Sequence, residues 1–191
     1  MNEFFDTNFV DRAIIFAVNH HKNTERKLKK IPYIVHPMEA MSIVASITSD
    51  NELLAAAAMH DLIEDTDVTY DDIKKEFGQR VADIVLFESN NSFPNYDKLN
   101  WVETRQMGID RLKSASLDCK IVALGDKLSN MRSIRTDFKT CGDSFWTRFH
   151  ESDPKLHKWR YTELTKCFDG LEETDAYIEF KNLVEEVFSG I

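Results

Sequence analysis

Hydrophobic residues recur along most of the chain at intervals of three and four positions, which is the spacing of one face of an α-helix. The stretch "FVDRAIIFAVNHH" (residues 9–21) shows this pattern first, and a basic, apolar-poor loop, "HKNTERKLKKIPY" (residues 21–33), follows it. We find no convincing alternation of apolar and polar residues of the kind that marks a strand, no internal repeat and no low-complexity segment. The pattern therefore predicts an all-α protein.

Capping signals divide this pattern into individual helices. Two capping boxes, Ser49–Glu52 and Thr69–Asp72, each predict a helix start, and the first helix should run through four alanines to about Glu64. Pro37 suits the first position of a helix that begins at His36. Further helices are predicted at about 79–88, 101–115, 117–137, 144–151, 155–169 and 172–189, with a loop at 89–100. No linker is evident, so we expect one domain over residues 1–191, a compact bundle of about eight to ten helices.

Composition and charge exclude several classes of protein. The net charge of −9 argues against a sequence-independent nucleic-acid binder, which needs a basic surface. No segment approaches the ~18 apolar residues of a membrane helix, and the acidic start argues against a secretory signal. Cys119, Cys141 and Cys167 are widely spaced and odd in number, which argues against disulfides and favours a reducing cytoplasm. Nothing in the sequence indicates an oligomeric state.

The segment "AAAAMHDLIEDTD" (residues 55–67) places a histidine and several acids directly after four alanines. On one helix with ~3.6 residues per turn, His60, Asp61, Glu64 and Asp65 would share a face. Carboxylates on one face repel each other, and a divalent cation would offset that cost. A solvated helix end is the alternative interpretation, but the alanines predict close packing, and polar groups on a buried helix need partners.

Two more residues could complete a metal site. His36 follows "PYIV" at a helix start, and Asp126 lies in the apolar run "KIVALGDKLSNM", where an unpaired carboxylate is costly. Alone, each is better explained as a capping or hydrogen-bonded group. Combined with His60 and Asp61, they give two imidazoles and two carboxylates, a set that suits Mn²⁺, Fe²⁺ or Zn²⁺ better than Ca²⁺ or Mg²⁺.

Four ordered blocks, "RKLKKIPYIVHP", "HDLIEDTDVT", "FGQRVADIV" and "DKLSNMR", resemble the HD-domain hydrolases of the RelA/SpoT type. The similarity is greatest to the small alarmone hydrolases, which carry this domain alone. It covers roughly residues 12–137, with weaker similarity at "WTRFH" and "KWRYTEL" in a C-terminal helical extension, residues 138–191. The resemblance implies a metal-dependent enzyme of the stringent response that removes pyrophosphate from the 3′ position of guanosine tetra- or pentaphosphate, (p)ppGpp.

The resemblance also assigns roles to particular residues. The metal ligands, usually for Mn²⁺, would be His36, His60, Asp61 and Asp126, and the residues that activate water would be Glu64 and Asp65. The nucleotide base would be contacted by Arg26, Lys27 and Asn130, and Lys127 and Arg132 are weaker candidates for phosphate contacts. The basic loop around Arg26 could concentrate a polyanionic nucleotide on an otherwise acidic protein.

Several alternatives stay open at this stage. The same metal centre could act on an adenosine alarmone, the 2′-phosphate of NADPH or a nucleoside monophosphate. A nucleotide-binding sensor without catalysis is a further alternative, although a pure binder has no need of Glu64 and Asp65. The chain departs from the family pattern at "FESNNSFP" and at Gly125, where alanine is usual.

Overall fold

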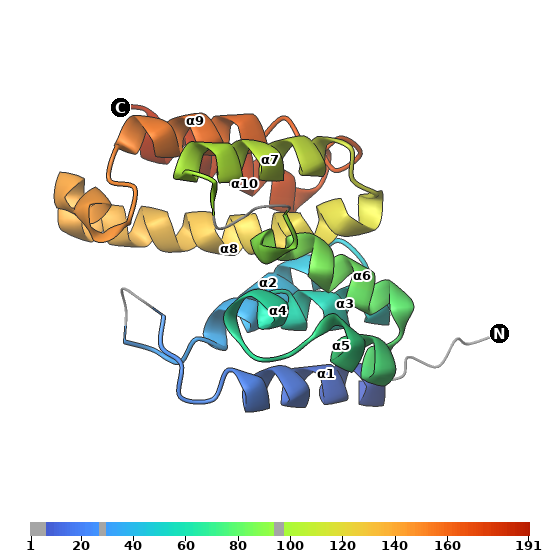
Figure 1. Ribbon diagram of the computed structural model, residues 1–191. Helices are drawn as coiled ribbons and strands as arrows, with labels where there is room; N and C mark the ends of the chain where they lie inside the picture. Colours follow the sequence, from blue (N-terminus) through green and yellow to red (C-terminus); the bar gives the residue numbers. More distant parts are fainter. Residues whose placement is uncertain (1–6, 27–29, 94–97) are drawn as a thin grey trace.

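The computed structural model describes residues 7–26, 30–93 and 98–191 (Figure 1). Within this part of the chain, the only extended pairing is one antiparallel bridge between Glu25 and Pro32. All other regular structure there is helical, so the prediction of an all-α fold is confirmed. None of the described helices is both long and apolar enough to cross a membrane.

The helices differ widely in length, and one of them organises the others. In chain order they are α1 (Thr7–His20), α2 (Val35–Ala45), α3 (Asn51–Met59), α4 (Leu62–Asp65), α5 (Tyr70–Phe77), α6 (Gln79–Glu88), the 3₁₀-helix η1 (Asn90–Ser92), α7 (Trp101–Lys113), α8 (Leu117–Cys141), the 3₁₀-helix η3 (Gly142–Arg148), α9 (Pro154–Leu164) and α10 (Asp175–Phe188). Figure 1 shows α8 between two groups, with α1 to α6 on one side and α7, α9 and α10 on the other.

The position of α8 follows from its sequence. Every residue from Lys120 to Asp126 is buried, so the helix has no solvent-facing side in this segment. A helix that is apolar around most of its circumference is stable only inside a protein. It packs against α2 on one side and α10 on the other, and its core residues join one hydrophobic cluster that runs from α1 to α10.

The four alanines of α3 perform the packing role that the sequence predicted. Ala55, Ala56, Ala57 and Ala58 have no exposed surface. Their small side chains let α3 pack between α1, α2, α6 and α8. The acidic segment that follows them therefore begins in the interior of the protein.

The helix predicted from the Ser49–Glu52 capping box to about Glu64 is wrong in two respects. Its N-cap is Asp50, which accepts a hydrogen bond from the Glu52 amide at 2.9 Å, so the Ser49–Glu52 capping box does not form. The helix also ends at Met59, and a new short helix, α4, begins at Leu62. His60 and Asp61 therefore lie in a turn and not on one continuous helical face.

The physical reason for this break is a competing hydrogen bond. The Nδ1 atom of His60 lies 2.9 Å from the carbonyl oxygen of Ala57. In an unbroken helix that carbonyl would accept from the amide of Asp61, four residues later. A side chain that takes a backbone acceptor in this way interrupts the ladder of helical hydrogen bonds.

Other predicted boundaries are close to those observed. The Thr69–Asp72 capping box forms at the start of α5, and Gly78, with φ of +91°, ends that helix. The segment predicted as a helix at 144–151 is instead the 3₁₀-helix η3, and α8 continues past residue 137. The predicted loop at 89–100 contains η1, and residues 94–97 lie outside the described part of the chain.

Candidate metal centre

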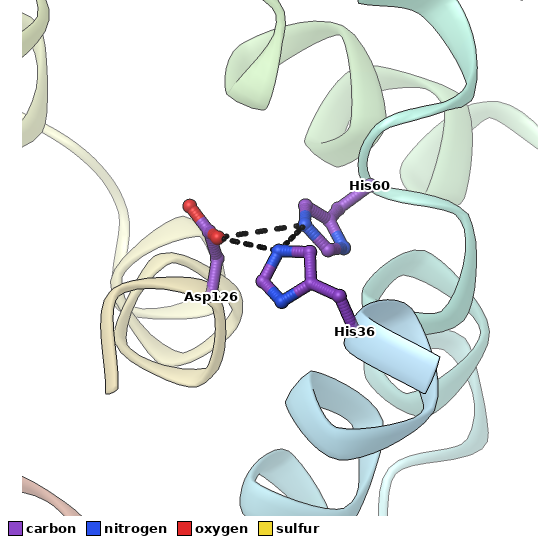
Figure 2. A group of neighbouring side chains, drawn as sticks. All are labelled: His36, His60 and Asp126. Carbon is purple, nitrogen blue, oxygen red and sulfur yellow. Dashed lines mark hydrogen bonds and ion pairs between the residues drawn. The ribbon is translucent and has the colours of Figure 1, made fainter. Parts of the chain in front are cut away.

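Three distant segments of the chain meet at His36, His60 and Asp126 (Figure 2). These residues come from the second position of α2, the turn after α3 and the middle of α8, and all three are buried. Their ligand atoms lie within 4.8 Å of one another. The Nε2 atoms of the two histidines are 3.3 Å apart, and Oδ1 of Asp126 is 3.0 Å from Nε2 of His36 and 3.6 Å from Nε2 of His60.

Asp61 approaches the same two nitrogens. Its Oδ2 atom lies 3.0 Å from Nε2 of His60 and 3.6 Å from Nε2 of His36. The hydroxyl of Tyr33 donates a hydrogen bond of 2.7 Å to this oxygen. The fold therefore gathers all four side chains that the sequence analysis selected as metal ligands.

Each histidine uses its other nitrogen for a bond to the protein. Because the Ala57 carbonyl can only accept, Nδ1 of His60 carries a proton, and Nε2 is the ring atom that faces the cluster and can offer a lone pair to a cation. Nδ1 of His36 lies 2.8 Å from Oγ of Ser129, so here too it is Nε2 that faces the cluster. Two ring nitrogens and two carboxylates thus point at a common region.

The electrostatics of this region favour positive charge between the two carboxylates. Burial disfavours a charged imidazole at His60, but the carboxylates of Asp61 and Asp126 outweigh it and raise its pKa. Burial also disfavours ionised carboxylates, yet His60 and His36 hold the pKa of Asp61 low, and Lys127 and both histidines do the same for Asp126. A mixed set of nitrogen and oxygen donors fits a divalent transition metal, so the residues present are suitable for the ion.

Glu64 and Asp65, the two acids that follow the candidate ligand Asp61, lie on the short helix α4. Glu64 accepts hydrogen bonds from Asn90 of η1, at 2.8 Å from its backbone amide and at 3.0 and 3.3 Å from its side-chain amide. Asp65 follows Glu64 in the same short helix. Both acids line the same cleft as Asp61 and Asp126.

This cleft has a volume of about 630 Å³ and reaches from three of the candidate ligands, His36, Asp61 and Asp126, to the C-terminal part of the chain. Its far wall is built from side chains of α7, η3, α9 and the segment between η3 and α9, and it includes aromatic residues. The arginines that line the cleft are Arg26, Arg105, Arg148 and Arg160. A space of this size with several cations suits an anionic ligand the size of a nucleotide.

Two of the predicted nucleotide contacts lie together in this cleft. The guanidinium of Arg26 donates to the side-chain oxygen of Asn130 at 2.9 Å, and Asn130 in turn donates to Asp126 at 2.5 Å. These bonds join the loop before α2 to α8, directly next to the metal centre. Lys27, the partner of Arg26 in the sequence prediction, lies outside the described residues.

The two weaker phosphate candidates are placed differently. Lys127 forms an ion pair with Asp126 and lies 3.3 Å from Glu88, and the structure places it on a separate cavity of about 50 Å³. Arg132 forms a two-pronged bond to Glu179 of α10, at 2.7 and 2.6 Å. Among the described residues that line the large cleft, neither of these cations appears. Lys127 is thus paired with the candidate ligand Asp126, and Arg132 links α8 to α10.

Further residues, not predicted from the sequence, support the site from outside. The Tyr33 hydroxyl contacts the candidate ligand Asp61, and the Ser129 hydroxyl contacts the candidate ligand His36. Both residues belong to the quoted motifs "PYIVHP" and "DKLSNMR", and their hydroxyl groups were the feature that could have marked them as hydrogen-bond partners. His21 lies in the cleft wall, 3% exposed, with its ring centroid 4.9 Å from that of Tyr33. Neither ring nitrogen of His21 has a hydrogen-bond partner among the described residues.

Histidine and aspartate side chains from α2, from the turn after α3 and from α8 around one point define a helical, metal-binding histidine–aspartate domain. The family model described as HD domain matches residues 13–145, and the chain belongs to that family. The chain is 32% identical over 180 residues to a guanosine-3′,5′-bis(diphosphate) 3′-pyrophosphohydrolase, MESH1, of Xenopus tropicalis, with 92% of each chain covered. It is 34% identical to the MESH1 of Homo sapiens, with 87% of each chain covered.

A longer bacterial relative matches over a small part of its own length. It is the guanosine-3′,5′-bis(diphosphate) 3′-pyrophosphohydrolase of Aquifex aeolicus, 43% identical over 133 residues, which are 65% of this chain and 18% of that protein. Among solved structures, a metazoan orthologue of SpoT described as hydrolysing ppGpp has a TM-score of 0.76 at 19% identity, covering 93% of this chain and 94% of its own, which shows the fold. The Listeria monocytogenes protein lmo0812 has a TM-score of 0.71 at 27% identity, covering 83% of this chain and 96% of its own.

Proposed function

We propose that this chain is a metal-dependent guanosine-3′,5′-bis(diphosphate) 3′-pyrophosphohydrolase. The observation that carries the proposal is the convergence of two Nε2 atoms and two carboxylates at one side of a cleft of about 630 Å³ that is also lined by four arginines. The curated relatives that match most of the chain carry the name of this activity. The same convergence argues against a purely structural helical protein, because crowded acceptor atoms destabilise a fold that binds no cation there.

The ion would be held by His36, His60, Asp61 and Asp126, and we propose Mn²⁺ because the donor set mixes imidazole nitrogen with carboxylate oxygen. Such an ion, when bound, acidifies a coordinated water and polarises a phosphoryl oxygen of the substrate. The protein's contribution is to hold the donors rigidly. His60 is fixed by the Ala57 carbonyl, and Asp61 is fixed by the Tyr33 hydroxyl.

Glu64 is the general base in this proposal. Its carboxylate lies in the cleft wall, one turn beyond the HD pair, and Asn90 holds it through its backbone and side-chain amides. Glu64 would take a proton from water as the water oxygen attacks the phosphorus bonded to the 3′ oxygen. The bond between that phosphorus and the 3′ oxygen would break, pyrophosphate would leave with the new oxygen, and the proton would pass to the 3′ oxygen of the nucleoside. Asp65, at the end of the same short helix, would help to orient the water.

The remaining cleft residues would bind the nucleotide. Arg26 and Asn130, already bonded to each other, present a planar guanidinium and an amide beside the metal centre, where a purine could stack and form hydrogen bonds. Arg105, Arg148 and Arg160 line the far wall and would stabilise the negative charge of a second phosphate group. A substrate with phosphates at both ends uses both walls of the cleft.

The test is a comparison of substrates with the purified protein and Mn²⁺. Guanosine 3′,5′-bis(diphosphate), its adenosine counterpart, NADPH and GMP would be supplied separately, and release of pyrophosphate and of phosphate would be followed in each. We expect pyrophosphate release from the guanosine tetraphosphate and loss of that activity in His60→Ala and Asp126→Ala. His20→Ala, at an exposed histidine outside the cleft, is the matched control and should keep wild-type activity.

Each other outcome has a definite meaning. Phosphate release from NADPH or GMP alone would identify another substrate for the same metal centre. Tight binding of the guanosine nucleotide without turnover under any divalent ion would identify a sensor. We also propose that residues 1–191 act as a single domain, and that the protein works in a reducing cytoplasm, since Cys119, Cys141 and Cys167 are all free thiols.

A further inference from the structure

The orientation of His36 depends on a buried hydroxyl. Oγ of Ser129 lies 2.8 Å from Nδ1 of His36 and 2.7 Å from Oε2 of Glu39. Ser129 has no exposed surface, and His36 is 3% exposed, so the bond between these two side chains is shielded from water. Ser129 follows Asp126 by three positions on α8, so this helix supplies one candidate ligand and also the group that touches a second one.

Counting protons decides the direction of these bonds. A serine hydroxyl has one proton to donate, whereas an ionised carboxylate can only accept. Ser129 therefore donates to Glu39, and its oxygen must accept from Nδ1–H of His36. With its proton on Nδ1, His36 keeps a free lone pair on Nε2, the atom 3.0 Å from Asp126.

We propose that Ser129 and Glu39 are positioning residues that fix the tautomer and ring orientation of His36 for metal binding. This inference rests on the metal centre of the proposed function. In metal sites generally, a group that holds the second nitrogen of a ligand histidine changes metal affinity by about 10- to 100-fold. Here the carboxylate acts through a serine, because Glu39 contacts Ser129 and not the ring.

The hydrogen-bonded chain from Glu39 through Ser129 to His36 forms a relay, and two ion pairs of Arg132 link this relay to the C-terminal helix, α10. Arg132 lies 3.3 Å from Oε1 of Glu39 and binds Glu179 of α10 at 2.6 Å. These three side chains are 37 to 41% exposed, so solvent screens the pair and its effect on Glu39 is small. This arrangement provides a control: loss of Glu179 should matter far less than loss of Glu39.

The experiment measures metal binding with the metal alone, in competition with a chelator, for Mn²⁺ and Zn²⁺. Ser129→Ala should weaken binding by about 10-fold or more. Glu39→Ala should do the same, because the freed hydroxyl can then donate to Nδ1 and permit the wrong tautomer. Glu39→Gln keeps an acceptor for Ser129 and should stay within about threefold of wild type, as should Glu179→Gln.

A second readout separates this role from general loss of structure. In the Zn²⁺-loaded protein labelled with ¹⁵N at histidine, long-range NMR correlations identify which ring nitrogen of His36 carries a proton, and wild type and Glu39→Gln should show Nδ1–H. Thermal unfolding of the metal-free variants supplies the folding control, and Glu39, being partly exposed, keeps the test valid if Ser129→Ala fails to fold.

Wild-type metal affinity in both Ser129→Ala and Glu39→Ala would overturn the proposal, as would a wild-type protein that binds neither ion. Equal losses in Glu39→Ala and Glu39→Gln would also overturn it, since charge and not the relay would then be responsible. If the relay behaves as expected but no nucleotide is hydrolysed, the proposed function fails while the positioning role stands.

Discussion

Gly125 of α8 faces the backbone of Ala40 in α2 so closely that a β-carbon at position 125 would lie 2.8 Å from the Ala40 carbonyl oxygen. The same β-carbon would lie 2.8 Å from Cγ2 of Val44. α2 carries His36 and α8 carries Asp126, so the absence of a side chain at Gly125 sets the distance between these two candidate ligands.

Replacing Gly125 by alanine should therefore separate the two helices. An alanine gains about 1 kcal/mol of helix propensity over glycine, but overpacking against backbone costs about 1–3 kcal/mol. We expect a net decrease in the free energy of unfolding of about 1 kcal/mol and weaker metal binding, measured by urea denaturation and chelator competition.

Gly108→Ala is the matched control for that variant. Gly108 lies within α7, and an added β-carbon there would meet nothing within 4 Å. The same substitution should stabilise the protein by about 0.5–1 kcal/mol and leave metal affinity unchanged. A Gly125→Ala protein that gained stability and kept its metal affinity would contradict the spacing argument.

Glu64→Gln should separate metal binding from turnover. The amide keeps the shape of the side chain and can still accept a hydrogen bond from Asn90, but it cannot take a proton from water. We expect the metal dissociation constant to stay near its wild-type value while kcat falls by about 10²- to 10⁴-fold. Glu76→Gln, at an exposed acid on α5, should leave kcat unaltered. Unchanged turnover in Glu64→Gln would remove Glu64 from the role of base.

The ion pairs of Arg80 should make the free energy of unfolding sensitive to acid. Its guanidinium lies 2.8 Å from Asp50, 2.7 Å from Glu52 and 2.8 Å from Asp118, so it joins α6 to the starts of α3 and α8. Partial burial works against ionisation of Asp50, but hydrogen bonds from Arg80 and from the Glu52 amide outweigh it and lower the pKa of Asp50 below its ordinary 3.8.

Because this pKa is lower in the folded than in the unfolded protein, the pair stabilises the fold above about pH 4, and the stabilisation is lost as the pH falls further. Arg80→Ala should cost about 1 kcal/mol at pH 7, since the groups are partly exposed, and the difference from wild type should shrink at pH 3. Urea denaturation at several pH values measures this. Asp50→Asn, which keeps the helix cap, should remove part of the pH dependence. An Arg80→Ala effect of equal size at pH 7 and pH 3 would refute the predicted sensitivity to acid.

Removal of the divalent ion should lower stability. Without it, each of the two carboxylates lies 3.0 to 3.6 Å from both ring nitrogens, with no metal ion between them. An ion at 100 times its dissociation constant would add about 2.7 kcal/mol to the free energy of unfolding. We expect Tm to fall on chelation, to recover with Mn²⁺, and to become independent of Mn²⁺ in Asp126→Ala. A wild-type Tm that ignores both chelator and Mn²⁺ would show that these residues hold no ion.

Predictions from the sequence agree best with the structure where the signal is local, or where side chains from separate segments suit the same kind of site. The Thr69–Asp72 capping box depends on residues three positions apart, and it forms as predicted. The buried carboxylate of Asp126 stood out because an apolar run made it costly, and the structure pairs it with His36 and His60. By contrast, the continuous helix through His60 was wrong, because one ring–carbonyl bond outweighed helix propensity.

The sequence by itself determined that the chain is helical, since hydrophobic period and capping depend on neighbours a few positions away, and that its histidines and acids suit a divalent metal. Only the tertiary structure decided which cations reach the cleft: Arg26 does, whereas Arg132 binds Glu179. It also decided the pairing of Ser129 with Glu39, 90 positions apart, and the contact of Gly125 with Ala40. Such choices depend on how helices pack across long separations, where geometry selects one partner from many of equal chemistry.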